Sequence, residues 1–266
     1  MTPVPYWHVD AFARHPFEGN QAAVMILDSW PDDDTLRQIG AENNFAETAF
    51  LLRDDTGEAD WELRWFTPTE EVKMCGHATL ASGHVVLTRD CRDAVRFRTR
   101  HAGILEVSRE GSGYALSLPS SRVEQRDMPE LLAALNLDAP AFDTVEGAEQ
   151  TTIIALNSEA EVRAVRPDMA SLSRIDRMAI CTAAGETADV VSRVFVPAWG
   201  VPEDSVTGSA HAALVPFWCD RLGRERFTAF QASERGGHLT CRREGSRAVL
   251  NGPCVTVVEG RFYLPG

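Results

Sequence analysis

Two short glycine-led segments constrain the fold of this chain more than any other feature. Residues 75–78 read CGHA and residues 207–210 read TGSA, and an apolar run at helical spacing follows each. The start of a helix has backbone N–H groups without partners inside the helix and carries the positive end of its dipole. Because glycine leaves that backbone open, each segment predicts a helix start that can bind an anion, and two facing starts would hold a carboxylate.

The positions of the two segments indicate an internal duplication. Each lies late in its half of the chain, after several short strand patterns. One central apolar helix per half, among many strands, is typical of an α+β fold and not of regular β-α alternation. We expect two pseudo-symmetric domains, 1–118 and 122–258, joined by a linker at 119–121. The tail 259–266 would return to the first domain.

Hydrophobic periodicity predicts the individual elements. Helices are expected at 32–43, 76–88, 128–137, 168–175 and 209–222. Strands are expected at 6–12, 22–27, 49–52, 61–66, 95–99, 103–108, 114–118, 151–156, 178–182, 189–196, 228–231, 238–242, 248–251 and 254–258.

Composition narrows the class of partner. The chain has 39 acidic and 26 basic residues, a net charge of −13, which disfavours nucleic acid and anionic membranes. No apolar run approaches the roughly 20 residues that span a bilayer, and residues 1–10 lack a signal-like core. We therefore expect a cytoplasmic protein whose partner is a small metabolite.

The cysteine pattern gives no sign of a metal site. The 6 cysteines form no C-x-x-C pair and no close Cys/His cluster. We expect free thiols, with neither a disulfide framework nor a bound metal.

Three residues of the first half are candidates for chemistry. Glu47 lies in the apolar, amide-rich segment 43–50, where partial desolvation would raise its pKa and suit it to accept and return a proton. Beside the positive helix end, His77 would be a neutral hydrogen-bonding imidazole, and the pKa of Cys75 would be lowered. Since Thr207 occupies the corresponding position of the second half, no two-thiol proton shuttle is available.

The second half offers a matching set. Glu203 and Asp204 precede its helix start, and Ser209 follows it. These residues can simply satisfy the helix terminus, or Asp204 can hold a substrate amine or hydroxyl. Further candidates for a cleft rim are Gly19 with Asn20, Arg193, and residues 235–237.

Taken together, the motifs resemble the phenazine-biosynthesis PhzF-like family, which is related to diaminopimelate epimerase. The resemblance runs through nearly the whole chain, in blocks at 9–12, 17–20, 44–50, 64–68, 75–81, 193–197, 203–211 and 231–237.

This resemblance implies a fold and an activity. Each domain would be a strongly curved, mostly antiparallel sheet around a central helix, and the protein would be a homodimer without cofactor. The active site would lie between the domains. Proton transfer and substrate positioning would fall to Glu47, His77, Asp204 and Ser209, and substrate binding to Asn20, Cys75, Gly76, Thr207 and Gly208.

Three residues depart from the family pattern, and they bear on the substrate. Gln21 and Ser205 stand where proline is expected, and Lys73 stands where an acid is expected. Phenazine-pathway members also commonly lack a cysteine at position 75. These departures leave the substrate open while the proton-transfer residues remain.

Four functions stay open at this point. The leading one is a proton-shifting isomerase similar to trans-2,3-dihydro-3-hydroxyanthranilate isomerase, with Glu47 as base and acid. The others are an epimerase that uses Glu47 and Cys75, a non-catalytic metabolite-binding protein, and a cysteine hydrolase that uses Cys75 with His77. The hydrolase is disfavoured because close neighbours at a helix start are expected to point apart and no orienting acid is evident.

Overall fold

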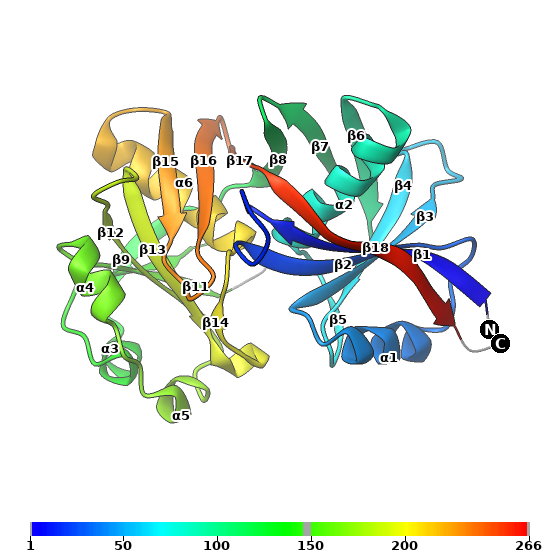
Figure 1. Cartoon of the computed structure of the whole chain (residues 1–266). Helices are drawn as coiled ribbons and strands as arrows, with labels where there is room; N and C mark the ends of the chain where they lie inside the picture. The colour runs from blue at the N-terminus through cyan, green and yellow to red at the C-terminus, as the bar shows by residue number, and fades with distance from the viewer. Residues whose placement is uncertain (1, 146–149, 265–266) are drawn as a thin grey trace. The chain divides into compact units, whose positions relative to one another are not determined.

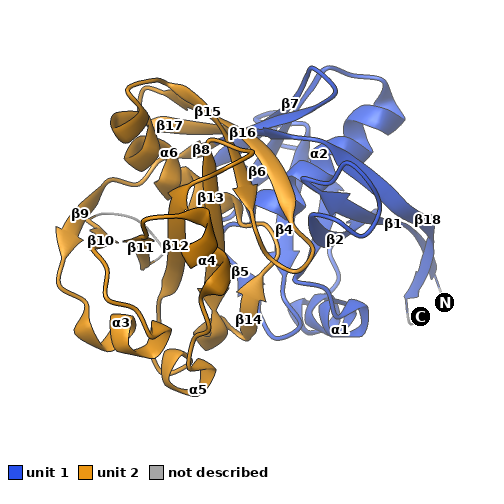
Figure 2. Cartoon of the chain, turned by 60° about the vertical axis from the view of Figure 1, so that its left-hand side comes forward, with its two compact units in different colours: residues 1–117, 251–266 blue, residues 118–250 orange. Residues whose placement is uncertain are grey.

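The computed structural model of the chain describes residues 2–145 and 150–264 (Figure 1). The chain forms two compact units, coloured separately in Figure 2. Unit 1 comprises Met1–Ser117 together with Asn251–Gly266, and unit 2 comprises Leu118–Leu250. Each unit combines one curved sheet with a few helices, which is the α+β class expected from the sequence.

Unit 1 contains most of the N-terminal elements and the last strand of the chain. They are β1 (Thr2–Ala11), β2 (Asn20–Ile26), α1 (Asp33–Asn43), β3 (Glu47–Arg53), β4 (Trp61–Phe66), β5 (Glu71–Val72), α2 (Gly76–Asp90), β6 (Ala94–Thr99), β7 (Ile104–Glu110), β8 (Gly113–Pro119), which ends just past the boundary, and β18 (Cys254–Leu264).

Unit 2 contains the elements between them. They are β9 (Val123–Arg126), α3 (Pro129–Leu135), β10 (Ala141–Thr144), β11 (Thr151–Ala155), α4 (Glu159–Ala164), α5 (Met169–Leu172), β12 (Met178–Ala184), β13 (Val190–Val196), the 3₁₀ turn η1 (Pro197–Trp199), β14 (Val201–Asp204), α6 (Gly208–Leu222), β15 (Arg226–Gln231), β16 (Gly237–Glu244) and β17 (Arg247–Gly252).

The two units repeat one scheme of strand pairing. In unit 1, β18, β1 and β2 are antiparallel neighbours, β2 and β3 are parallel, and β4 is parallel to β6. In unit 2, β9, β10 and β11 are antiparallel neighbours, β11 and β12 are parallel, and β13 is parallel to β15. The internal duplication indicated by the two glycine-led segments is therefore present in the fold.

The last strand differs from the sequence-based domain assignment. Residues 251–258 were expected in the second domain, but they belong to unit 1. The reason is the pairing of β18 along the whole of β1, from Thr2 opposite Leu264 to Ala11 opposite Cys254. In unit 2 the same sheet position is filled by β9, which directly precedes that unit's other strands.

A buried helix forms the centre of unit 1. The curved sheet packs around α2, with contacts from β1, β2, β3, β6 and β7 (Figure 1). Of the 15 residues of α2, 11 are buried, as its all-round apolar sequence predicts. At Gly83 the sheet comes so close that a Cβ atom would lie 2.3 Å from Cγ1 of Val107 on β7. In unit 2, α6 is the equivalent buried helix.

The elements that the sequence did not predict are all short. They are β5, β9, β10, η1, β14 and α4, while the helix expected at 168–175 shrinks to α5. A strand of two to four residues has too few positions to show an alternation, and its pairing partners decide its conformation.

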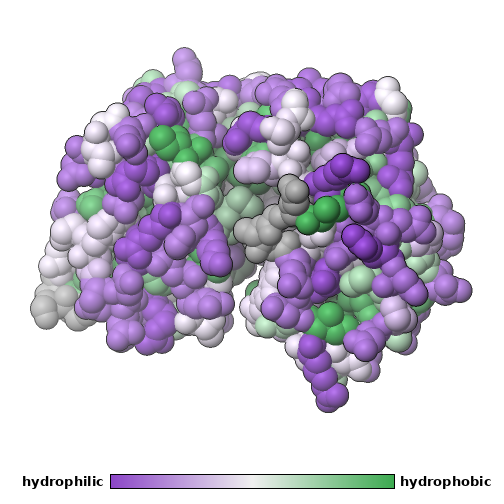
Figure 3. Space-filling view, turned by 180° about the vertical axis from the view of Figure 1, so that it is seen from behind, coloured by the Kyte–Doolittle hydropathy of each residue, from purple (hydrophilic) through white to green (hydrophobic). Residues whose placement is uncertain are grey.

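The surface has the polar character expected of a strongly charged chain. The face seen in Figure 3 is mostly hydrophilic, with apolar residues in small separate areas. Among the residues described, no helix is both long and apolar enough to cross a bilayer.

Candidate active site

The two buried helices begin in the same way. The cap residues, Cys75 of α2 and Thr207 of α6, both have extended backbone, with φ of −142° and −109° and ψ of 110° in each. Neither cap residue makes a capping hydrogen bond with its own side chain. Neither helix start is thus satisfied in the usual way by its cap, which favours the binding of an anion there.

The same back-contact stabilises each cap. Thr79 Oγ1 donates to the carbonyl of Cys75 across 2.5 Å, and His211 Nδ1 donates to the carbonyl of Thr207 across 2.8 Å. Thr79 and His211 occupy equivalent positions, four residues after the cap. The duplication therefore extends to the polar contacts at the helix starts.

In unit 1 the start of α2 meets the starts of two strands. His77 Nε2 lies 3.1 Å from Glu47 Oε2 at the beginning of β3. Its Nδ1 lies 3.2 Å from Asn20 Nδ2 at the beginning of β2 and 3.5 Å from Cys75 Sγ. Because β2 and β3 pair in parallel, Asn20 and Glu47 lie at the same end of these two neighbouring strands. Four predicted site residues of the first half thus form one cluster around His77.

Burial separates the members of this cluster. Asn20, Cys75 and His77 are buried, whereas the Glu47 side chain keeps 18% of its surface exposed. Glu47 Oε2 is itself buried against His77, so the exposed part of the side chain lies away from the imidazole. Glu47 is therefore the member of the cluster that a ligand from solvent can reach.

The electrostatics of Cys75 are opposite to the sequence-based expectation. Burial, and then the negative charge of Glu47, raise the pKa of the Cys75 thiol to about 12, with only partial opposition from His77. The prediction of a lowered pKa is wrong because burial and a neighbouring carboxylate outweigh the helix dipole. At neutral pH the group is a thiol and not a thiolate.

His77 also departs from expectation. Burial by itself would lower the pKa of His77, but the facing Cys75 and Glu47 outweigh it and raise the pKa well above its ordinary value. Because Cys75 is protonated at neutral pH, we assign the effect there to the Glu47 carboxylate. The prediction of a neutral imidazole considered only the positive helix end, and the Glu47 carboxylate acts on the pKa of His77 in the opposite direction.

The sequence predicted that Cys75 and His77 would point apart. In the structure the two side chains are in contact. The 3.5 Å contact between Sγ and Nδ1, with Glu47 on the other ring nitrogen, matches the order of groups in a cysteine hydrolase. A hydrolase nucleophile must be an accessible, activated thiolate, however, and this thiol is buried with a raised pKa. The side chains therefore have the order found in a cysteine hydrolase, but the Cys75 thiol is not activated as a nucleophile.

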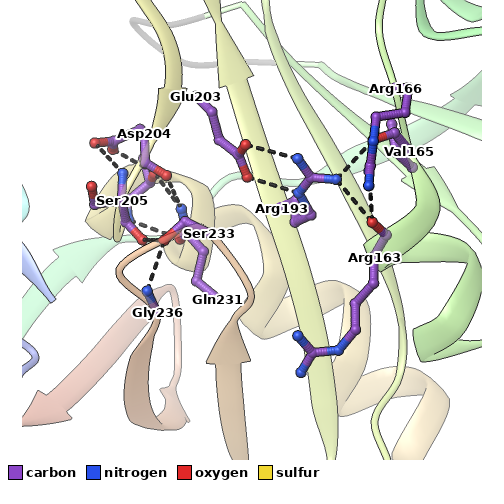
Figure 4. Close-up of polar contacts among 11 residues, drawn as sticks. Arg163, Val165, Arg166, Arg193, Glu203, Asp204, Ser205, Gln231, Ser233 and Gly236 are labelled. Atoms are coloured by element: carbon purple, nitrogen blue, oxygen red, sulfur yellow. Dashed lines mark hydrogen bonds and ion pairs between the residues drawn. The ribbon is translucent and has the colours of Figure 1, made fainter. Parts of the chain in front are cut away.

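In unit 2 a network of hydrogen bonds holds the segment before α6 (Figure 4). The Asp204 carboxylate accepts from the Ser205 N–H across 2.9 Å and from Thr207 Oγ1 across 2.5 Å. Fully buried Gln231 accepts from the Thr207 N–H across 2.9 Å and donates to the Asp204 carbonyl across 2.7 Å. Gln231 thereby fixes both ends of the turn that leads into Gly208.

Sequence reasoning gave Gln231 no role of its own. Its only signal is a polar residue at the end of an otherwise alternating strand, β15. The burial that makes this amide important comes from the sheet around it and is not visible in the sequence.

Arg193, a candidate for a cleft rim, links β13 to β14 and to the segment after α4. Its guanidinium donates to both carboxylate oxygens of Glu203, each across 2.7 Å, and to the Val165 carbonyl across 2.8 Å (Figure 4). Glu203 is thus committed to Arg193 and does not serve the helix start. The adjacent Asp204 is left as the acid beside α6.

The remaining candidates of unit 2 fall around the same turn. Ser233 Oγ donates to the Ser205 carbonyl across 2.7 Å and accepts from the Gly236 N–H across 3.1 Å. Gly208 is buried and Ser209 is half-buried at the start of α6. Whether this set and the cluster in unit 1 act on one ligand stays a prediction.

Comparison with known proteins places the chain in a family. The family model described as phenazine biosynthesis-like protein matches residues 9–260. An uncharacterised isomerase of Pseudomonas aeruginosa is 45% identical over 263 residues, which cover 97% of this chain and 98% of that protein.

Solved structures agree with that result. A phenazine biosynthesis protein of the PhzF family from Enterococcus faecalis has a TM-score of 0.90 at 36% identity, covering 99% of this chain and 100% of that one. A hydroxyproline epimerase from Agrobacterium vitis has a TM-score of 0.63 at 13% identity, covering 97% and 92%, a likeness of fold alone. The chain belongs to the phenazine biosynthesis-like protein family, an enzyme family that includes bacterial relatives named as uncharacterised isomerases.

Proposed function

We propose that this protein is a cofactor-independent isomerase that moves a proton within a small carboxylate-bearing substrate. The reaction would be similar to that of trans-2,3-dihydro-3-hydroxyanthranilate isomerase, on a substrate that is a cyclic amino acid. The observation that carries the proposal is the Glu47–His77 pair, a partly exposed carboxylate against a buried imidazole.

Glu47 is the general base and then the general acid. Its ionised carboxylate takes a proton from a substrate carbon, and the resulting carboxylic acid returns that proton to a second carbon, so the substrate changes in bond position only. His77 stays buried and holds Glu47 through the 3.1 Å ion pair. Its ring is positioned in turn by Asn20 and Cys75 at Nδ1.

Substrate binding falls to the uncapped helix starts and to the polar turn of unit 2. The helix starts after Cys75 and Thr207 suit a carboxylate, because neither cap residue makes a side-chain capping hydrogen bond. Asp204, set in its hydrogen-bond network, suits a substrate amine, and half-buried Ser209 suits a further polar group.

An epimerase is the second candidate, because the Cys75 thiol lies beside Glu47. Racemisation by two bases would need a Cys75 thiolate in one of the two directions. With a thiol pKa of about 12, forming that thiolate at pH 7 costs about 7 kcal/mol. This cost favours a single base, Glu47.

Solvent exchange distinguishes the two reactions. Small cyclic and acyclic amino acids that raise the melting temperature are incubated with the enzyme in D₂O and followed by NMR. A one-base isomerase yields a positional isomer that retains part of the transferred hydrogen, whereas a two-base epimerase yields the mirror-image centre with deuterium. If the wild-type protein binds these ligands but neither converts them nor exchanges their hydrogen for deuterium, the protein is a metabolite-binding protein instead.

The proposal extends to assembly, from the family resemblance, and to location, from the sequence pattern. We expect a homodimer in the cytoplasm. Analytical ultracentrifugation and fractionation of cells test these two points independently of the chemistry.

A further inference from the structure

We propose that Glu47, Cys75 and His77 form an inhibitory site for one thiophilic divalent cation of the Zn²⁺ class. The sequence indicated no close Cys/His cluster, but the fold creates one. One carboxylate oxygen of Glu47, the Sγ atom of Cys75 and one ring nitrogen of His77 all lie within 4.8 Å of one another. The metal site rests on this geometry, and its inhibitory effect rests on the proposed function of Glu47.

The measured spacing suits a tetrahedral ion. With Zn–S of about 2.3 Å and Zn–N of about 2.0 Å, two ligands of one tetrahedron lie about 3.5 Å apart. Cys75 Sγ and His77 Nδ1 are 3.5 Å apart. The third ligand belongs to Glu47, the partly exposed member, whose side chain is the one with room to adjust.

One ligand atom of the cluster is open to a new bond. Glu47 Oε2 is buried and has no well-aligned hydrogen bond among the described residues, although it lies 3.1 Å from His77 Nε2. A buried oxygen without such a bond is costly. A cation bound to His77 Nδ1 and Cys75 Sγ would offer this oxygen a partner.

The donor set selects the cation. A thiolate, an imidazole and one carboxylate are ligands typical of Zn²⁺, whereas Mg²⁺ and Ca²⁺ require oxygen ligands throughout. Two anionic ligands also neutralise a doubly charged ion, which removes the penalty of an unbalanced charge at a buried position. On binding, the thiol proton and any proton on the ring nitrogen that binds the cation leave to solvent, and no bond to carbon changes.

The fourth position of such an ion would remain open to water or to a substrate group. Because Glu47 is then a ligand, it cannot accept a proton. The cation would therefore block the reaction, and a chelator would restore it.

Co²⁺ is the probe, because its thiolate complexes absorb in the near ultraviolet. The chelator-treated wild-type protein is titrated with Co²⁺, and a saturable 1:1 sulfur-to-cobalt band that Zn²⁺ displaces is expected. Cys75→Ser should abolish the band. Cys91→Ser, which removes the exposed thiol, is the matched control and should keep it.

A second variant keeps the test decisive where Cys75→Ser does not fold. Glu47→Gln retains the thiol and the imidazole, so it should keep the band with an affinity for Co²⁺ weakened about tenfold or more. Three results would each overturn the proposal. The wild-type protein shows no band, folded Cys75→Ser keeps the band, or Cys91→Ser loses it. Since the readout needs no substrate, failure of the metal site and failure of the isomerase function are separate results.

Discussion

Glu47 and His77 form an ion pair across 3.1 Å between the first residue of a strand and the second residue of a buried helix. One partner is partly exposed and the other is buried, so the pair joins a reachable carboxylate to a fixed imidazole. This asymmetry distinguishes a residue that transfers a proton from a residue that holds it in place, and it motivates the first prediction.

Glu47→Gln is expected to lower turnover by about 10²–10⁴-fold while the fold persists, because the amide keeps the shape and cannot carry the proton. Rates of isomer formation by NMR and melting temperatures are measured together. Glu58→Gln, at an exposed glutamate, is the control and should retain full activity. Unchanged turnover in Glu47→Gln would remove Glu47 from the mechanism.

Cys75→Ala is expected to retain most of the activity, since a buried thiol with a pKa of about 12 is a poor base at neutral pH. Its measurable effect should be on stability, because the side chain packs at the start of α2. Steady-state rates and urea unfolding separate the two effects. A loss as large as that of Glu47→Gln would support the epimerase instead.

The folded protein should lose stability as the pH falls, because buried His211 resists protonation. Burial lowers the pKa of His211 to about 4, with partial opposition from its hydrogen bond to Thr207. The unfolded chain, with an ordinary pKa near 6.5, therefore binds more protons than the folded protein between about pH 4 and 6.5. The free energy of unfolding is expected to drop by up to about 3 kcal/mol as pH falls through this window.

The measurement is urea unfolding of the wild type and of His211→Gln as a function of pH. The variant should show a shallower slope below about pH 6.5. His101→Gln, at an exposed histidine, should follow the wild-type curve. Parallel curves for the wild type and His211→Gln would contradict the assignment.

Gly83→Ala is expected to destabilise unit 1 by about 1–3 kcal/mol, because its Cβ would lie 2.3 Å from Val107 Cγ1. Alanine favours a helix by only about 1 kcal/mol over glycine, so the clash decides the sign. Chemical denaturation gives the size. In the Val107→Ala background the same substitution should cost much less, and an equal cost would show that the close packing is not responsible.

Both helix starts are expected to bind small carboxylates. Amide resonances of residues 76–78 and 208–210 should shift in a saturable manner during titration with a benzoate-like or amino-acid carboxylate. The net charge of −13 does not prevent this, since charges beyond roughly 8 Å are screened at physiological salt. If only one helix start responds to every ligand tried, the paired carboxylate site is wrong.

The sequence alone determined the features that are local or periodic. The apolar runs at 76–88 and 209–222 predicted the two buried helices, observed as α2 and α6, because burial on all sides leaves a continuous hydrophobic pattern. The ordered motifs indicated the family that the comparisons show. Gly76 and Gly208 marked both helix starts, since glycine before an apolar run is a local signal.

Only the tertiary structure decided the features that depend on distant segments. The pKa of Cys75 is raised and not lowered because the sheet buries this helix start and, secondly, because residue 47, far away in the sequence, brings a carboxylate to it. The last strand belongs to unit 1 because β1 supplies its pairing partners. Gln231 gained its importance in the same way, from hydrogen bonds to a turn elsewhere in the chain. Helix and strand patterns reflect neighbours along the chain, whereas electrostatics and strand pairing reflect neighbours in space.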